Sequence, residues 1–155
     1  MARNKYRTGL TSKVLIGVVG VILFASVVML IVTISKNNRF NGFKNELSHL
    51  SGSGEYSMTA EYKGGTYEAT VDGMSHLYSF LSNASRNEGM NSAKILDTVT
   101  VRFSGTEDEA VLTLSQTDAE YVKVTLDSGS ENYTYWFKCA VGYRSLLKLT
   151  GAPTE

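Results

Sequence analysis

The sequence predicts an α+β protein with a single N-terminal transmembrane helix. A small domain follows, with an antiparallel β-sheet of about six strands (ββαββββα) and helices on one face. Three observations predict this class. Residues 14–34 carry no charge, residues 55–71 and 98–139 alternate apolar and polar side chains, and 155 residues leave room for one folded domain. The expected divisions are a basic tail at 1–13, the transmembrane helix at 14–34, an amphipathic juxtamembrane segment with a linker at 35–54, and the α+β domain at 55–155.

The apolar segment at 14–34 reads VLIGVVGVILFASVVMLIVTI and has 21 residues. At about 1.5 Å per residue, a helix of this length spans roughly the 30 Å hydrocarbon core of a bilayer. Lys13 and Lys36 stand at its two ends, where long basic side chains reach the lipid headgroups. A cleaved signal peptide is the alternative, but its apolar region is shorter, and Thr33-Ile34-Ser35 is a poor cleavage site.

Charge is distributed unevenly along the chain. Residues 1–44 hold seven of the 15 basic residues and no acidic residue, which leaves eight basic against 15 acidic residues in the remainder. Four Lys and Arg residues precede the apolar segment, and three follow within ten residues. The positive-inside rule therefore predicts a cell-membrane protein with its N-terminus in the cytoplasm and its acidic domain outside. The lipid bilayer is an expected partner, whereas nucleic acid is not, because an acidic domain repels phosphates.

The juxtamembrane segment contains an apolar stripe at helical spacing, formed by Phe40, Phe43, Leu47 and Leu50. A helix with this stripe has three possible uses: it lies on an anionic membrane surface, it extends the transmembrane helix as a stalk, or it packs on the protein's own core. Ser51-Gly52-Ser53-Gly54 predicts a flexible break before the domain.

The period of the apolar residues then changes from 3.6 to 2. Residues 55–71 predict a β-hairpin that turns at Gly64-Gly65, and Asp72 is expected to cap a helix that ends near residue 87. Four alternating runs follow, separated by turns rich in glycine and acidic residues, and they predict an antiparallel meander. A short closing helix is expected over residues 141–150.

Residues that could carry chemistry are few. Cys139 shares the apolar face of the last strand, so its thiol is expected to be buried and inert, and His49 and His76 are expected to face solvent. The acidic turn Glu107-Asp108-Glu109 lacks the spacing of a calcium loop. We therefore expect no catalytic residues, no metal, no cofactor and no enzymatic activity.

The polar face of the meander is the most suggestive feature of the sequence. Strand alternation places three basic residues and the only tryptophan of the chain on one side, together with a tyrosine: Arg102, Tyr121, Lys123, Trp136 and Lys138. Such a face could bind an envelope protein or an anionic polymer, with the aromatic rings providing contact area. The alternative is an ordinary solvated face on which Trp136 lies under the closing helix.

The leading hypothesis is a membrane-anchored, non-catalytic interaction or ligand-binding domain. A second is a structural subunit: the basic leader, the apolar helix continuing into an amphipathic one and the antiparallel sheet are similar to the layout of type IV pilins, and Arg7-Thr8-Gly9 resembles the end of a prepilin leader. The chain departs from that family at Val14, where pilins have a glutamate, and at Lys13, where they are apolar. A cell-envelope hydrolase is the least favoured alternative.

Overall fold

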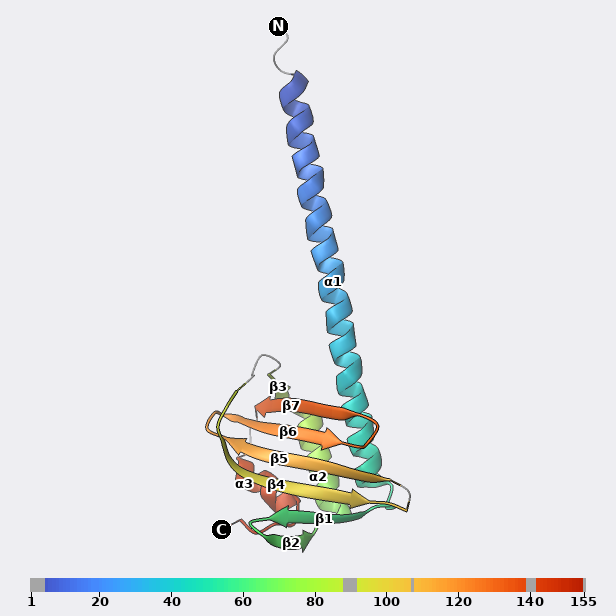
Figure 1. Ribbon diagram of the computed structural model, residues 1–155, viewed down its shortest axis with the longest axis vertical. Helices are drawn as coiled ribbons and strands as arrows, with labels where there is room; N and C mark the ends of the chain where they lie inside the picture. The colour runs from blue at the N-terminus through green and yellow to red at the C-terminus, as the bar shows by residue number, and fades with distance from the viewer. Residues whose placement is uncertain (1–4, 88–91, 107, 139–141, 155) are drawn as a thin grey trace. The chain divides into compact units, whose positions relative to one another are not determined.

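The computed structural model describes residues 5–87, 92–106, 108–138 and 142–154. The chain divides into two compact units, Met1–Asn41 and Gly42–Glu155. The elements are drawn in Figure 1; in chain order they are α1 (Lys5–Gly52), β1 (Ser57–Tyr62), β2 (Gly65–Glu68), α2 (Val71–Asn83), β3 (Ser85–Arg86), β4 (Ile95–Ser104), β5 (Glu109–Thr117), β6 (Tyr121–Asp127), β7 (Asn132–Lys138) and α3 (Tyr143–Leu149). This order confirms the predicted α+β class.

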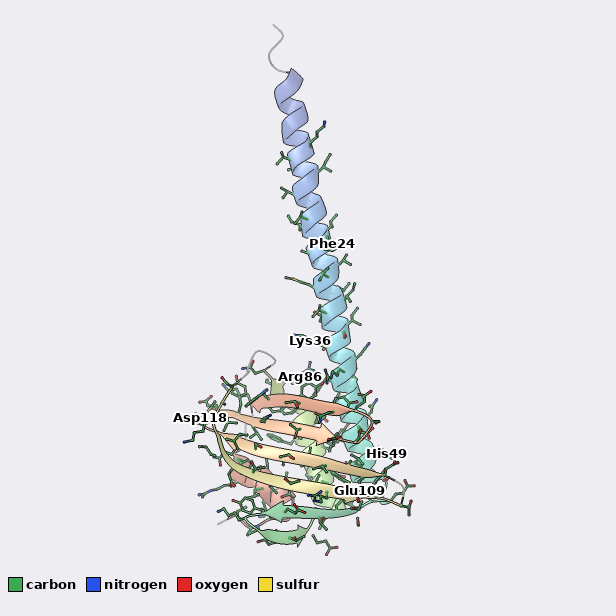
Figure 2. The ribbon with its side chains drawn as sticks, in the orientation of Figure 1. Phe24, Lys36, His49, Arg86, Glu109 and Asp118 are labelled. Atoms are coloured by element: carbon green, nitrogen blue, oxygen red, sulfur yellow. The ribbon has the colours of Figure 1, made fainter. Side chains whose placement is uncertain are left out.

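The first unit contains the apolar part of α1. An 18-residue window there has a mean hydropathy of 3.1 and no buried residue, so by length and composition this helix can cross a membrane. Its large apolar side chains are exposed, from 42% at Val28 to 72% at Phe24, which is labelled in Figure 2. The hydroxyls of Ser26 and Thr33 donate to the carbonyl oxygens of Ile22 and Met29, each at 2.8 Å. These bonds satisfy both hydroxyls within the helix, as an apolar surrounding requires.

The last turns of α1, from Gly42 onward, belong to the second unit. Phe43, Leu47 and Leu50 of the predicted stripe are buried there, and the Phe43 ring lies 5.2 Å from the ring of Tyr135 and 5.9 Å from that of Tyr133. Of the three alternatives for the stripe, burial on the protein's own core therefore holds for this part of it. The helix ends at Gly52, within the segment where the sequence predicts a break, and Gly54 follows with φ of 68°.

The sheet has seven antiparallel strands in the order β2-β1-β4-β5-β6-β7-β3. The predicted hairpin is confirmed, but its turn lies one residue earlier than expected, because Gly65 already pairs with Tyr62 and begins β2. The turn residues are Lys63 and Gly64, whose positive φ values of 47° and 78° are those of a primed two-residue turn. The additional strand, β3, has two residues and pairs with the end of β7. A strand of two residues has no periodicity, so the alternation pattern could not predict it.

Within the described ranges, helices cover only one face of the sheet. In Figure 1, α2 and α3 lie behind the strands, and their buried residues Met74, Leu77, Leu81, Leu146 and Leu147 meet the inward side chains of β4 to β7 in one core. At Gly73 an added Cβ would stand 2.3 Å from the carbonyl oxygen of Leu149. A side chain there would separate α2 from α3.

The structure corrects both boundaries of one helix. The helix α2 ends at Asn83, not near residue 87, because Ala84 has an extended backbone with ψ of 147° and Ser85 begins β3. The cap of α2 is Thr70, whose Oγ1 accepts a hydrogen bond from the amide of Gly73 at 3.1 Å, and Asp72 lies in the first turn. The expectation that Asp72 caps this helix was therefore wrong, because the alternation that suggested a strand up to Val71 continues into the helix. Cys139 and Glu107, two of the residues considered for chemistry, lie outside the described residues.

Candidate functional site

The face of the sheet opposite the helices is called the open face below, and it is turned toward the viewer in Figure 1. Its side chains form registered rows, of which the most regular consists of four threonines on neighbouring strands: Thr100, Thr113, Thr125 and Thr134. Three of them are half-buried and Thr134 is exposed. Hydroxyl-bearing, β-branched side chains suit a strand face that meets water, so this row needs no ligand to explain it.

Arg102 is on the open face, as predicted, but its charge is already paired. Its Nε donates to Oε1 of Glu61 on the neighbouring strand β1 at 2.7 Å. This hydrogen bond lowers the pKa of the Glu61 carboxyl below its ordinary value. Because both side chains are about half exposed, at 50% and 46%, the pair contributes little to stability. The main consequence of this ion pair is that the charge of Arg102 already has a partner in Glu61.

Lys138 is also paired. Its ammonium lies 3.3 Å from Oε2 of Glu120, and the two side chains are 58% and 82% exposed. Water screens a pair this exposed, so the contact is easily exchanged for another anion.

Lys123 differs from the other two basic residues. It stands directly opposite Trp136 in the β6–β7 register, and its ammonium lies 5.7 Å from the centre of the indole ring. A cation over an indole is attracted by the negative face of the ring. Among the described residues, no carboxylate forms an ion pair with Lys123.

The structure brings together four of the five predicted residues. Tyr121 is in register with Lys138, and Lys123 is in register with Trp136, so these four occupy adjacent positions on β6 and β7. Arg102 is in register with Val111, near the Glu109 end of β5, whereas Tyr121 follows the Asp118 end. Figure 2 labels Asp118 at the left and Glu109 at the right of the sheet, at opposite ends of its strands. Arg102 therefore belongs to a different part of the open face.

Two apolar residues at the same end of the sheet were missed by sequence reasoning. Strand β4 begins at Ile95, three residues before the predicted run, and its register shifts between Ile95 and Asp97. Ile95 and Leu96 are 48% and 55% exposed. The available signal was two consecutive apolar residues beside an alternating run, since both of them cannot face one core.

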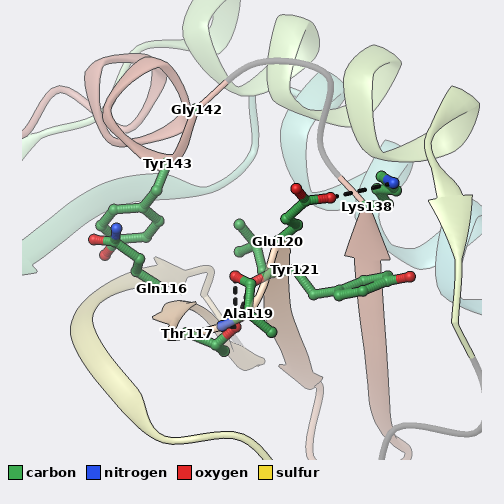
Figure 3. A pocket seen from close by; sticks show the side chains of 9 residues that line it. Gln116, Thr117, Ala119, Glu120, Tyr121, Lys138, Gly142 and Tyr143 are labelled. Atoms are coloured by element: carbon green, nitrogen blue, oxygen red, sulfur yellow. Dashed lines mark hydrogen bonds and ion pairs between the residues drawn. The ribbon is translucent and has the colours of Figure 1, made fainter.

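A depression of about 350 Å³ opens where β5 and β7 end and β6 begins, next to α3 (Figure 3). Its lining consists of Gln116, Thr117, Ala119, Glu120, Tyr121, Val122, Lys138, Gly142 and Tyr143. The Thr117 hydroxyl donates to the carbonyl of Tyr121 at 2.7 Å, and the Glu120–Lys138 pair stands at the rim. These polar groups are paired with one another, and no nucleophile beside a general base is found in the lining.

The remaining candidates lie apart from this region or on its border. His76 is exposed on α2 and borders a second depression, of about 500 Å³, together with Lys138. His49 is exposed, with its ring centre 5.9 Å from that of Tyr56. Within the described part of the chain, no three His, Cys, Asp or Glu residues are grouped to hold a metal ion. Lys13 and Lys36 are exposed on α1 at the two ends of the apolar segment.

No known protein family, curated protein or solved structure matches this chain.

Proposed function

We propose that this chain is a single-pass membrane protein that presents a small, non-catalytic binding domain outside the cytoplasm. The observation that carries the proposal is the apolar segment of α1, 21 uncharged residues between Lys13 and Lys36, followed in the same chain by a domain with a core of its own. The basic tail before the apolar segment favours a cytoplasmic N-terminus. A sheet whose open face is not covered by helices provides the binding surface.

The orientation can be tested by cysteine labelling. Ser130 is exposed in the turn between β6 and β7. Ser130→Cys in a Cys139→Ser background is expected to react with a membrane-impermeant maleimide on intact cells. The Cys139→Ser chain without the new cysteine is the control for background labelling. Reaction only after lysis would place the domain in the cytoplasm and overturn the orientation.

The binding role has a separate test. Changing Arg102, Lys123, Trp136 and Lys138 together to alanine is expected to abolish associations of the full chain with an envelope protein or an anionic polymer. If every association of the wild-type chain survives this change, the open face is not the binding surface.

A pilin-like subunit is the second candidate, and the continuity of α1 favours it. The apolar segment and the buried stripe lie on one helix, Lys5–Gly52, and the stripe packs on an antiparallel sheet, as in the layout that the sequence resembles. Assembly as a pilin-like subunit predicts that the chain is cleaved after Gly9. An intact N-terminus in the mass spectrum of the mature chain would exclude it.

A further inference from the structure

One end of the open face combines exposed apolar side chains with a cation, Lys123, that pairs with no carboxylate of the described residues. We name it the corner patch and define it as Ile95, Leu96, Tyr121, Lys123 and Trp136. We propose that the corner patch docks a partner protein, through a segment of the partner that is apolar and carries a carboxylate. This inference rests on the proposed binding role of the open face and adds the class of partner and the place of contact.

Exposure is the first argument. Among the described residues of the second unit, three large aliphatic side chains are exposed: Val71 at 44%, Ile95 at 48% and Leu96 at 55%. Two of these three belong to the corner patch, beside the half-buried rings of Tyr121 and Trp136. Exposed apolar residues that gather with Trp and Tyr are typical of protein interfaces, and single exposed apolar residues are not.

Register places Ile95, Tyr121, Lys123 and Trp136 on one surface, and Leu96 adjoins Ile95 at the bulge of β4. Ile95 is opposite Thr117 on β5, and the Thr117 hydroxyl bonds to the carbonyl of Tyr121, which begins β6. Lys123 lies two residues along β6 and is opposite Trp136 on β7. The patch thus crosses four adjacent strands, a width of about 14 Å at a strand spacing of about 4.8 Å. A helix or an extended segment of a partner can cover that width.

Charge complementarity identifies the polar part of the partner. Arg102 and Lys138 already face Glu61 and Glu120, whereas the Lys123 ammonium faces the Trp136 ring and no described carboxylate. A carboxylate from the partner would pair with Lys123 while apolar groups cover Ile95 and Leu96.

The aliphatic side chains favour a protein over an anionic polysaccharide. A sugar polymer can stack on Trp136 and pair with Lys123, but it has little to bury against Ile95 and Leu96. A second copy of this chain is also disfavoured, because a two-fold contact of the patch with itself would bring two Lys123 ammonium groups together. The geometry therefore fits a different protein.

Site-specific photo-crosslinking in native cells tests the proposal on the full chain. A benzoylphenylalanine probe at position 96 is expected to give a protease-sensitive product of higher mass, and the same probe at position 71 is expected to give none. Lys123→Met is expected to remove most of the product. Lys148→Met is the matched control and is expected to keep it, because Lys148 is exposed on α3, on the helix-covered side of the sheet. Circular dichroism confirms that both variants fold.

Four results would overturn the proposal. These are no product specific to position 96, a product unaffected by Lys123→Met, a product of twice the chain mass that contains only this protein, and a product that resists proteases and is degraded by periodate, which identifies a glycan. None of them depends on the maleimide result at position 130. The docking site and the membrane orientation can therefore fail independently.

Discussion

Tyr133 shows how a single buried residue responds to its surroundings. Its side chain is 4% exposed, and its ring lies 5.9 Å from that of Phe43. Burial, followed by the hydrogen bond and charge of Glu131, raises the pKa of the Tyr133 phenol from 10.0 to about 12. In the folded protein this phenol therefore keeps its proton at a pH where an unfolded tyrosine has lost it.

This pKa predicts a loss of stability in alkali. Between pH 10 and about 12 the unfolded chain binds fewer protons at Tyr133 than the folded chain, so the free energy of unfolding falls as the pH rises. Tyr133→Phe should weaken that fall, with Tyr67→Phe on the edge strand as the comparison. The free energy of unfolding is measured at several pH values by urea unfolding, followed by Trp136 fluorescence. An unchanged pH dependence in Tyr133→Phe would contradict the assignment.

At the residue scale, the sequence predicted where the candidate side chains lie better than it predicted their partners. Strand alternation placed Arg102, Lys123 and Trp136 on the open face. It could not show that Arg102 pairs with Glu61, 41 residues earlier in the chain, because that contact depends on the order of strands in the sheet. Alternation specifies the face of a strand and leaves its neighbours unspecified.

The last turns of α1 are the element whose role depends most on tertiary packing. The spacing of its apolar residues predicted a helix, but the same spacing fits a membrane surface, a stalk or a core. The structure buries Phe43 among three aromatic rings of β7, at centre distances of 5.2 to 6.1 Å. These aromatic partners lie about 90 residues further along the chain, and contact with them decides that this part of the stripe packs on the core.

Phe43→Ala should accordingly destabilise the domain strongly. Removing a fully buried phenylalanine costs about 3–5 kcal/mol, because it loses apolar burial and leaves a cavity. Asn45→Ala, at an exposed position on the same turn, should change the free energy of unfolding by less than about 0.5 kcal/mol. Chemical denaturation of the full chain in detergent micelles compares the two. Equal effects would show that the stripe does not contribute to the core.

Strand β4 shows a different limit of element prediction. Its regular part was predicted from Val99, Val101 and Phe103, but the register shift between Ile95 and Asp97 interrupts the alternation before it. A bulge changes which face the neighbouring residues of the strand occupy, so Ile95 could not be assigned to the open face from the sequence.

At the scale of the whole molecule, the chain combines two units that differ in where their apolar side chains lie. The first unit exposes a long apolar helix surface, and the second buries its apolar residues around the sheet and helices. Hydropathy predicted both features, because an uncharged 21-residue segment and an alternating domain differ plainly in composition. The details of pairing within the second unit required the structure.

Residues 42–155 should therefore fold when expressed alone. We expect a soluble fragment with a single cooperative unfolding transition, since its core lies within it. The full chain should enter the detergent-rich phase in a phase-separation experiment, whereas the fragment should remain in the aqueous phase. An insoluble or non-cooperative fragment would show that the second unit depends on residues 1–41.

The two outermost strands of the sheet are short, four residues in β2 and two in β3. Long bare edge strands are the sites at which sheets of separate molecules join and aggregate. Chains held in one membrane meet at high local concentration, which increases this hazard. Short outer strands offer a neighbour few backbone groups to pair with. In the proposed membrane-anchored arrangement, crowding would therefore leave the broad face of each sheet accessible.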